Sequence, residues 1–92
     1  MDRTTIAMKI RRQLGVLLPE VAVEHLADEA NLRDLASFDS LTVLQLMVWL
    51  EGEFDIEIAD DELTVERFDA IAKITDFVLL GRDRAGSTVG QP

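Results

Sequence analysis

The chain has 92 residues, enough for one small domain with a single hydrophobic core. It contains no cysteine, so it offers no disulfide, no thiolate metal site and no cysteine nucleophile. Eighteen acidic residues against nine basic ones give a formal net charge of −9, which argues against a general nucleic-acid binder, because such a protein needs basic side chains to neutralise phosphates.

The charge is unevenly distributed along the chain. Residues 1–13 carry four basic residues against one aspartate, whereas residues 51–69 carry nine carboxylates against one arginine. Such an acidic block is typical of a solvated surface, and it can also steer basic partners. The start of the chain lacks the apolar core of a signal peptide, and no apolar run reaches membrane-spanning length. We therefore expect a soluble, cytoplasmic monomer that binds neither nucleic acid nor a membrane.

The first helix is predicted over about residues 4–18. Thr4 or Thr5 can cap its start, and Pro19 marks its end, because a proline disfavours helix in the residue before it. Its apolar residues recur at helical spacing: Ile6, Ile10, Leu14 and Leu17 or Leu18.

A long connection follows, over about residues 20–38. Its apolar residues show no sustained period: Val21, Val23, Leu26, Leu32, Leu35 and Phe38. We expect a loop that these side chains pin to the core, with one short helical turn. A loop of this length is unusual in a compact domain and is commonly functional.

The second helix is predicted over about residues 40–53. The segment FDIEIADDEL that follows alternates like a strand, but a single strand would have no partner. We expect an extended link with Ile56 and Ile58 turned inward, and then a short third helix at about residues 64–67.

The last helix is expected to start near Asp69, which can cap it, and to stop at Gly81. Its buried stripe is predicted to contain Ile71, Ile74, Phe77, Val78 and Leu80. The fold class is therefore all-α: a small four-helix bundle of three main helices and one short helix, with a long first loop. The domain is expected to occupy residues 1–80, and the polar residues 81–92 to form a disordered tail.

The second helix is apolar nearly all the way round. Stepping about 100° per residue puts one set of residues on a contiguous face, the predicted core stripe: Val43, Leu46, Met47, Leu50 and Phe54. The opposite half is interrupted only by Gln45, with Thr42 at its flank, and carries Leu41, Leu44, Val48 and Trp49. Exposed apolar residues that gather in this way usually mark a partner surface. For Trp49, burial under a neighbouring loop is an equal alternative.

Asp39 and Ser40 stand at the start of this helix. Asp39 can be an ordinary cap that accepts hydrogen bonds from amides one turn on. Ser40 is also well placed to carry a phosphate ester, because free amides and the positive helix end favour an anion there. Asp39 would then be available to help hold a divalent metal while another enzyme attaches the group. The residues alone leave both interpretations open.

Three segments, FDSL at 38–41, LMVWLEGEFDIEI at 46–58 and FDAIAKITDFV at 68–78, resemble the carrier proteins of fatty-acid, polyketide and nonribosomal-peptide synthesis. The resemblance covers about residues 4–80. It implies that Ser40 receives 4′-phosphopantetheine from coenzyme A, that Asp39 is the neighbouring acid, and that Leu41 contacts partners. It also implies a carrier whose arm ends in a thiol that holds cargo as a thioester. Such a protein is not an enzyme and has no catalytic residue and no metal of its own.

The resemblance further implies the partners. A phosphopantetheinyl transferase would attach the arm, a loading acyltransferase or adenylating enzyme would charge it, and downstream synthase or tailoring enzymes would use the cargo. These enzymes would dock on the outer side of the second helix, at Leu41, Leu44, Gln45, Val48 and Trp49.

The chain departs from bacterial fatty-acid carriers, which resemble it but carry acidic residues along the exposed side of the second helix. The residues that differ are Ser37 and Phe38 ahead of the DSL triplet, and Thr42, Gln45, Trp49 and Gly52 in the helix. We therefore predict a stand-alone carrier in polyketide, nonribosomal-peptide or antibiotic biosynthesis, with acyl, aminoacyl or peptidyl cargo. The alternatives are a D-alanyl or other aminoacyl carrier, a fatty-acid acyl carrier and, from another class, an unmodified helical adaptor.

Other candidate sites are weaker. His25 is the only histidine in a chain without cysteine, so we expect a surface or loop-packing residue and no zinc site. The acidic run at 60–62 lacks the glycine and the ligand spacing of a calcium loop. Ser40 and His25 have no clear third member for a hydrolase triad.

Overall fold

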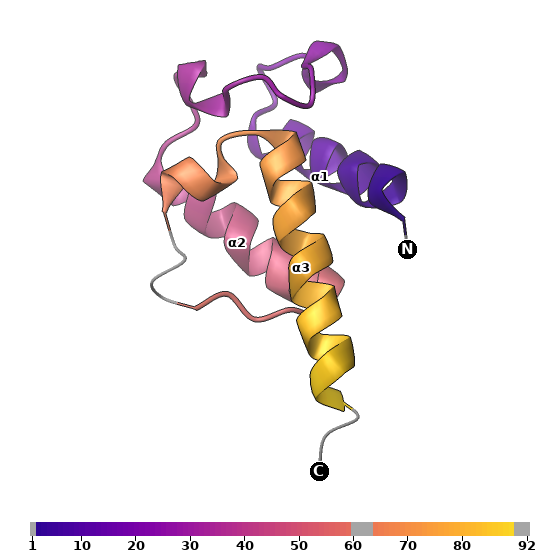
Figure 1. The fold of residues 1–92 in the computed structure, drawn as a ribbon. Coiled ribbons are helices and arrows are strands. Elements are labelled where there is room, and N and C mark those ends of the chain that lie inside the picture. The colour runs from indigo at the N-terminus through magenta and orange to yellow at the C-terminus, as the bar shows by residue number, and fades with distance from the viewer. Residues whose placement is uncertain (1, 60–63, 90–92) are drawn as a thin grey trace.

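The computed structural model describes residues 2–59 and 64–89 and is all-helical, with no strand among them (Figure 1). The α-helices are α1 (Arg3–Leu17), α2 (Ser40–Phe54) and α3 (Ile71–Val89). Within the described residues, three 3₁₀ helices lie between them: η1 (Val23–His25), η2 (Leu32–Asp34) and η4 (Val65–Phe68). In this part of the chain, none of the helices combines the length and the apolar character needed to cross a bilayer.

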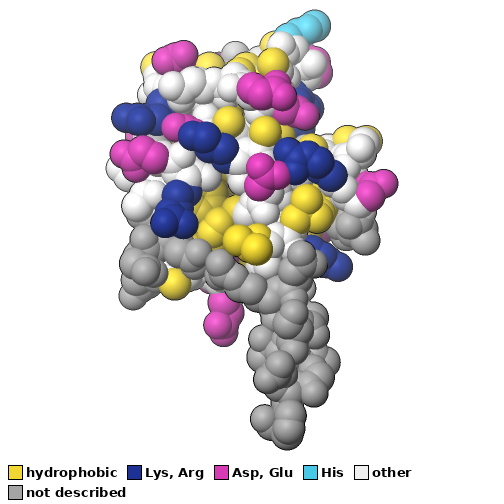
Figure 2. All heavy atoms as spheres, viewed as in Figure 1, with side chains coloured by type: hydrophobic (Ala, Val, Ile, Leu, Met, Phe, Trp, Pro, Cys, Tyr) yellow, Lys and Arg dark blue, Asp and Glu magenta, His cyan; other side chains and the backbone are white. Residues whose placement is uncertain are grey.

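The α-helices pack around one apolar core, with α1 lying mainly against α3. In Figure 1, α3 stands in front of α1 and α2, and the connection that carries η1 and η2 runs across the top. Figure 2, the same view as spheres, shows charged side chains of both signs around patches of hydrophobic ones. Fully buried side chains come from every α-helix, and they include Ile6, Ile10, Leu14, Leu46, Leu50, Ile71, Ile74 and Val78.

The predicted core stripes are confirmed except at Phe77, which is only partly buried, and at Leu80. Every residue of the α2 stripe is buried, and so are Leu18 and Phe38 at the two ends of the first connection. Leu80 was predicted to be buried, and this is wrong, since 51% of its surface is exposed. It follows the fully buried Val78 by two residues, and a two-residue step leads to nearly the opposite side of a helix.

The caps of the helices differ in part from the expectation. Asp2, not Thr4 or Thr5, caps α1, because its carboxylate accepts a hydrogen bond from the Thr5 amide at 2.8 Å. Asp69 was expected to cap the last helix, but α3 begins at Ile71, and the Asp69 carboxylate pairs with Lys73 at 2.8 Å.

Residues 56–59 of the link after α2 form neither helix nor strand, and Ile56 is buried and Ile58 partly buried against the core, as predicted. The rest of the predicted link, residues 60–63, lies outside the described residues. The link begins at Asp55, whose positive φ of 54° ends α2 in the left-handed region. The short helix predicted at residues 64–67 is present as the single 3₁₀ turn η4, not as a fourth α-helix.

Gly81 does not end the last helix, because α3 continues to Val89 and extends beyond the rest of the bundle (Figure 1). A Cβ atom at Gly81 would lie 3.2 Å from Cγ2 of Ile56, so the missing side chain lets the link pack closely against α3. A glycine inside a helix costs only about 1 kcal/mol, which such packing can offset. Residues 90–92 of the expected tail lie outside the described residues, and a domain boundary at residue 80 stays a prediction.

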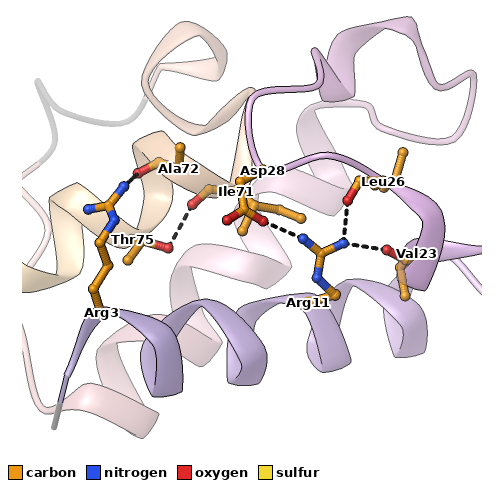
Figure 3. Close-up of polar contacts among 8 residues, drawn as sticks. All are labelled: Arg3, Arg11, Val23, Leu26, Asp28, Ile71, Ala72 and Thr75. Carbon is orange, nitrogen blue, oxygen red and sulfur yellow. Dashed lines mark hydrogen bonds and ion pairs between the residues drawn. The ribbon is translucent and has the colours of Figure 1, made fainter.

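The first connection is held by Arg11 of α1 (Figure 3). Its guanidinium donates to the backbone carbonyl oxygens of Val23 at 2.5 Å and Leu26 at 2.6 Å, and it pairs with the Asp28 carboxylate. The connection is also tied to the start of α3, because the Asp28 carbonyl accepts from the Ala72 amide at 2.9 Å. Two 3₁₀ turns interrupt the connection where one was expected.

Candidate functional site

Asp39 and Ser40 meet at the start of α2. Asp39 is the cap, with extended backbone (φ −109°, ψ −177°), and its carboxylate accepts a hydrogen bond from the Thr42 amide at 3.0 Å. That hydrogen bond is the main reason that the pKa of Asp39 lies below its ordinary value of 3.8. Asp39 is therefore an anion at neutral pH that fixes the first turn of the helix.

Ser40 is the first residue of α2, and its side chain is exposed. Its hydroxyl makes no hydrogen bond to another described residue, so no contact in this part of the chain has to break before the oxygen can react. A phosphate ester on this oxygen would lie at the positive end of α2, where a negative charge is favoured. The residues therefore fit a phosphodiester, and with it a phosphate-linked prosthetic group.

A short hydrogen-bonded network orients the segment that leads to Ser40. The Ser37 hydroxyl donates to the Glu20 carboxylate, which lowers the pKa of Glu20. The Thr42 hydroxyl donates to the Ser37 carbonyl oxygen at 3.0 Å. Phe38, between Ser37 and Asp39, is anchored in the core.

Sequence reasoning missed this network. It placed Thr42 at the flank of the outer face, whereas only 8% of Thr42 is exposed. A signal existed, because a threonine in the first turn of a helix often hydrogen-bonds to nearby backbone.

The outer side of α2 presents an apolar surface that starts beside Ser40. The exposed fractions are 63% for Leu41, 50% for Leu44 and 62% for Val48, and Gln45 between them is exposed as well. We call these four residues the outer α2 surface. The structure confirms that they are exposed; their role in docking stays a prediction.

Trp49 differs from its neighbours on the helix. It is half-buried, and its ring packs edge-on against Phe54 with ring centroids 5.6 Å apart. It also lines a hollow of about 210 Å³ between α1 and α2. The other lining residues are Lys9, Arg12, Gln13 and Glu53. The structure therefore brings four of the five predicted docking residues together on one surface and places Trp49 partly against the core.

The remaining candidates add no second site. His25 is exposed in η1, as expected for a surface histidine. No group of three or more potential metal ligands forms within residues 2–59 and 64–89. The acidic run at 60–62 lies outside the described residues. Within them, the carboxylates of the acidic block are exposed except for Asp69.

Comparison with known proteins gives one family. Residues 20–78, which include the start of α2 and its outer surface, match the family described as "Phosphopantetheine attachment site". The acyl carrier protein of Buchnera aphidicola subsp. Schizaphis graminum is 32% identical over 73 residues, which cover 79% of this chain and 89% of that protein. The acyl carrier protein of Desulforapulum autotrophicum is 33% identical over 58 residues, which cover 63% of this chain and 75% of that protein.

Proposed function

The chain belongs to the phosphopantetheine-binding carrier protein family, and on this premise we propose that Ser40 bears the arm. As a member of this family it is a carrier and not a catalytic enzyme, and its cofactor is covalently attached 4′-phosphopantetheine. The observation that supports Ser40 is its exposed hydroxyl at the first position of a helix that Asp39 caps.

The residues around Ser40 have separable roles in this proposal. Ser40 supplies the oxygen that attacks the phosphorus on the pantetheine side of coenzyme A. Its hydroxyl proton leaves, and the pyrophosphate bond of coenzyme A breaks to release adenosine 3′,5′-bisphosphate. Asp39 holds the first turn, and as the residue next to Ser40 it would offer a carboxylate to a divalent metal in the transferase complex. When bound, the arm supplies the thiol on which cargo is held as a thioester.

Carrier proteins interact with phosphopantetheinyl transferases and with acyl-handling enzymes. We propose that these partners dock on the outer α2 surface. Its apolar side chains are exposed next to Ser40, so a partner can cover them while it reaches the arm. A patch this small favours weak, reversible complexes, which suits a carrier that must visit several enzymes in turn.

For the cargo, we propose acyl, aminoacyl or peptidyl thioesters in polyketide or other natural-product biosynthesis, including nonribosomal peptides and antibiotics. The outer α2 surface supports a dedicated pathway, because Gln45 is neutral and exposed where fatty-acid carriers resembling this chain have acidic residues. The names of the relatives favour acyl cargo. A fatty-acid role and a D-alanyl or other aminoacyl role are the alternatives.

The first experiment is intact mass spectrometry of the full chain, before and after incubation with coenzyme A, magnesium and a broad-specificity phosphopantetheinyl transferase. We expect the gain of one phosphopantetheinyl group, and no gain in Ser40→Ala. Ser37→Ala is the matched control, because it removes a nearby serine hydroxyl and should still be modified. A folded, initially unmodified protein that gains no mass, or a Ser40→Ala variant that gains it, would refute the assignment of Ser40.

A second experiment separates the cargo classes and the adaptor alternative. The holo protein is offered to an acyltransferase with acyl-coenzyme A and to an adenylating enzyme with amino acids and ATP, and the acylated mass identifies the class. An unmodified helical adaptor predicts that Ser40→Ala keeps its function in cells whereas Leu44→Asp loses it. The carrier proposal predicts that the single substitution Ser40→Ala is sufficient to abolish the function.

A further inference from the structure

A second exposed surface lies on α1. Met8 and Val16 are 58% and 66% exposed, and Arg12 is exposed between them. The three residues are spaced four apart, so they form one row along the helix. We call the row, together with Lys9 and Gln13 beside it, the outer α1 surface.

This surface continues into the hollow between α1 and α2. Lys9, Arg12 and Gln13 form the α1 side of the hollow, and Trp49 and Glu53 form the α2 side. Lys9 and Glu53 bridge the two helices with an ion pair of 2.9 Å. At about 210 Å³, the hollow is smaller than the ~300–1,000 Å³ typical of small-molecule pockets, which suits one inserted side chain better than a whole ligand.

The charge of α1 is opposite to that of the whole chain. The helix carries four basic residues and no acidic one, whereas the chain has a net charge of −9. Three of the four are paired: Arg3 with Asp76, Lys9 with Glu53 and Arg11 with Asp28. Arg12 has no ion-pair partner among the described residues, and it lines the hollow together with the Trp49 ring and three other polar side chains.

We propose that the outer α1 surface binds an acidic segment of a partner protein. A carboxylate of that segment pairs with Arg12, and an adjacent apolar side chain enters the hollow beside Trp49. Met8 and Val16 widen the apolar contact on either side of Arg12. A protein segment fits better than an anionic lipid surface, because the hollow of about 210 Å³ accommodates one inserted side chain, which a segment can supply beside its carboxylate.

The α2 residues that line the hollow lie some distance from Ser40 along the helix, so a contact at the outer α1 surface differs from docking at the arm. Trp49 and Glu53 follow Ser40 by nine and thirteen residues, which places them about 14 and 20 Å further along the helix axis. A partner on the outer α1 surface therefore leaves Ser40 accessible. One protein can hold the carrier while the arm serves another, which raises the effective concentration of the cargo for that enzyme.

The test selects peptides from a random dodecapeptide display library on the full-length protein, with soluble Arg12→Glu variant as competitor. Binding of each selected peptide is then measured through the fluorescence of Trp49, the single tryptophan of the chain, using peptides that lack tryptophan. Arg33→Glu is the matched control, since Arg33 is an exposed arginine in η2 that does not line the hollow. Circular dichroism melts establish that both variants are folded.

We expect the selected peptides to combine aspartate or glutamate with leucine or phenylalanine. Their binding should weaken at least tenfold in Arg12→Glu, weaken with added salt and stay unchanged in Arg33→Glu. Basic peptides, no enriched peptide, or equal binding by Arg12→Glu would overturn the proposal. Vesicles of anionic phosphatidylglycerol are tested in parallel, and a Trp49 response to them with none to acidic peptides would assign the surface to membranes instead.

Discussion

The two sides of α2 carry the same kinds of side chain and differ in what covers them. Leu46 and Leu50 on the inner side are fully buried, whereas Leu44 and Val48 on the outer side are at least half exposed. Side chains of the same chemical kind therefore serve different purposes on the two sides of α2. The inner side provides stability, because burial of each leucine removes apolar surface from water. The outer side contributes little to stability, and we propose that its apolar side chains are exposed because they bind partners.

The largest expected effect on stability is on the inner side. Leu46→Ala should lower the free energy of unfolding by about 2–5 kcal/mol, because it leaves a cavity in a fully buried position. Urea unfolding followed by circular dichroism measures the change. Leu44→Ala, on the opposite side of the same helix, is the matched control; comparable losses in both variants would contradict the division of α2 into two sides.

A smaller effect is expected where the two sides meet, at Thr42. Thr42→Val keeps the shape of the side chain and removes the hydroxyl that donates to the Ser37 carbonyl, so it should cost about 1 kcal/mol. Thr42→Ser, which keeps the hydroxyl, should retain more of the interaction. The same unfolding assay applies. If Thr42→Val is as stable as the native protein, this hydrogen bond does not stabilise the start of α2.

Acid should weaken the capped ends of the helices before it affects the inner side of α2. Hydrogen bonds lower the pKa of Asp39, chiefly through the Thr42 amide, and the pKa of Glu20, chiefly through the Ser37 hydroxyl. The folded chain therefore keeps these carboxylates ionised to a lower pH than the unfolded chain does. Their stabilisation is complete above about pH 4.5, the ordinary value for Glu20, and it is lost as the pH falls through the lowered values.

Melting temperatures at about pH 6 and about pH 3 measure this loss, and Asp39→Asn is the control. Asparagine caps a helix about as well as aspartate but does not titrate, so the variant should lose less stability on acidification. An equal loss in both proteins would show that Asp39 does not contribute to the pH dependence.

The smallest effect on stability is expected on the outer side. Leu44→Asp should change the free energy of unfolding by less than about 0.5 kcal/mol, because half of Leu44 is already exposed. The rate of modification by the transferase should nevertheless fall about tenfold, since a charge would enter the proposed apolar contact. Thr4→Asp, at an exposed position on α1, is the control for added charge. A normal rate for Leu44→Asp would place the docking surface elsewhere.

Periodicity predicted the helices and most of their buried residues because burial of a regular stripe is a local property of the sequence. The resemblance around FDSL predicted the family and the candidate serine. Two of the failures depend on contacts that the sequence pattern does not show. Gly81 was expected to end the last helix, but it lies inside α3 and lets Ile56 pack closely against the helix. Thr42 was expected at the flank of the outer face, but its hydroxyl donates to the carbonyl oxygen of Ser37.

Trp49 shows the same limit for the candidate site. Its angular position on α2 placed it with Leu44 and Val48, but the ring also contacts Phe54 and borders α1. No property of α2 alone could indicate where α1 would lie. The hollow and its neighbouring Arg12 were therefore visible only in the structure.

Arg11 anchors the long first connection at three acceptors, in a chain that has no cysteine with which to cross-link it. The ordered structure of this connection therefore does not depend on a disulfide that oxidants could form or reductants could break. Once Ser40 carries the arm, the only sulfhydryl in the molecule would belong to the cofactor. A thiol-selective reagent would then count unloaded arms directly, without a background from the polypeptide and without disturbing the fold.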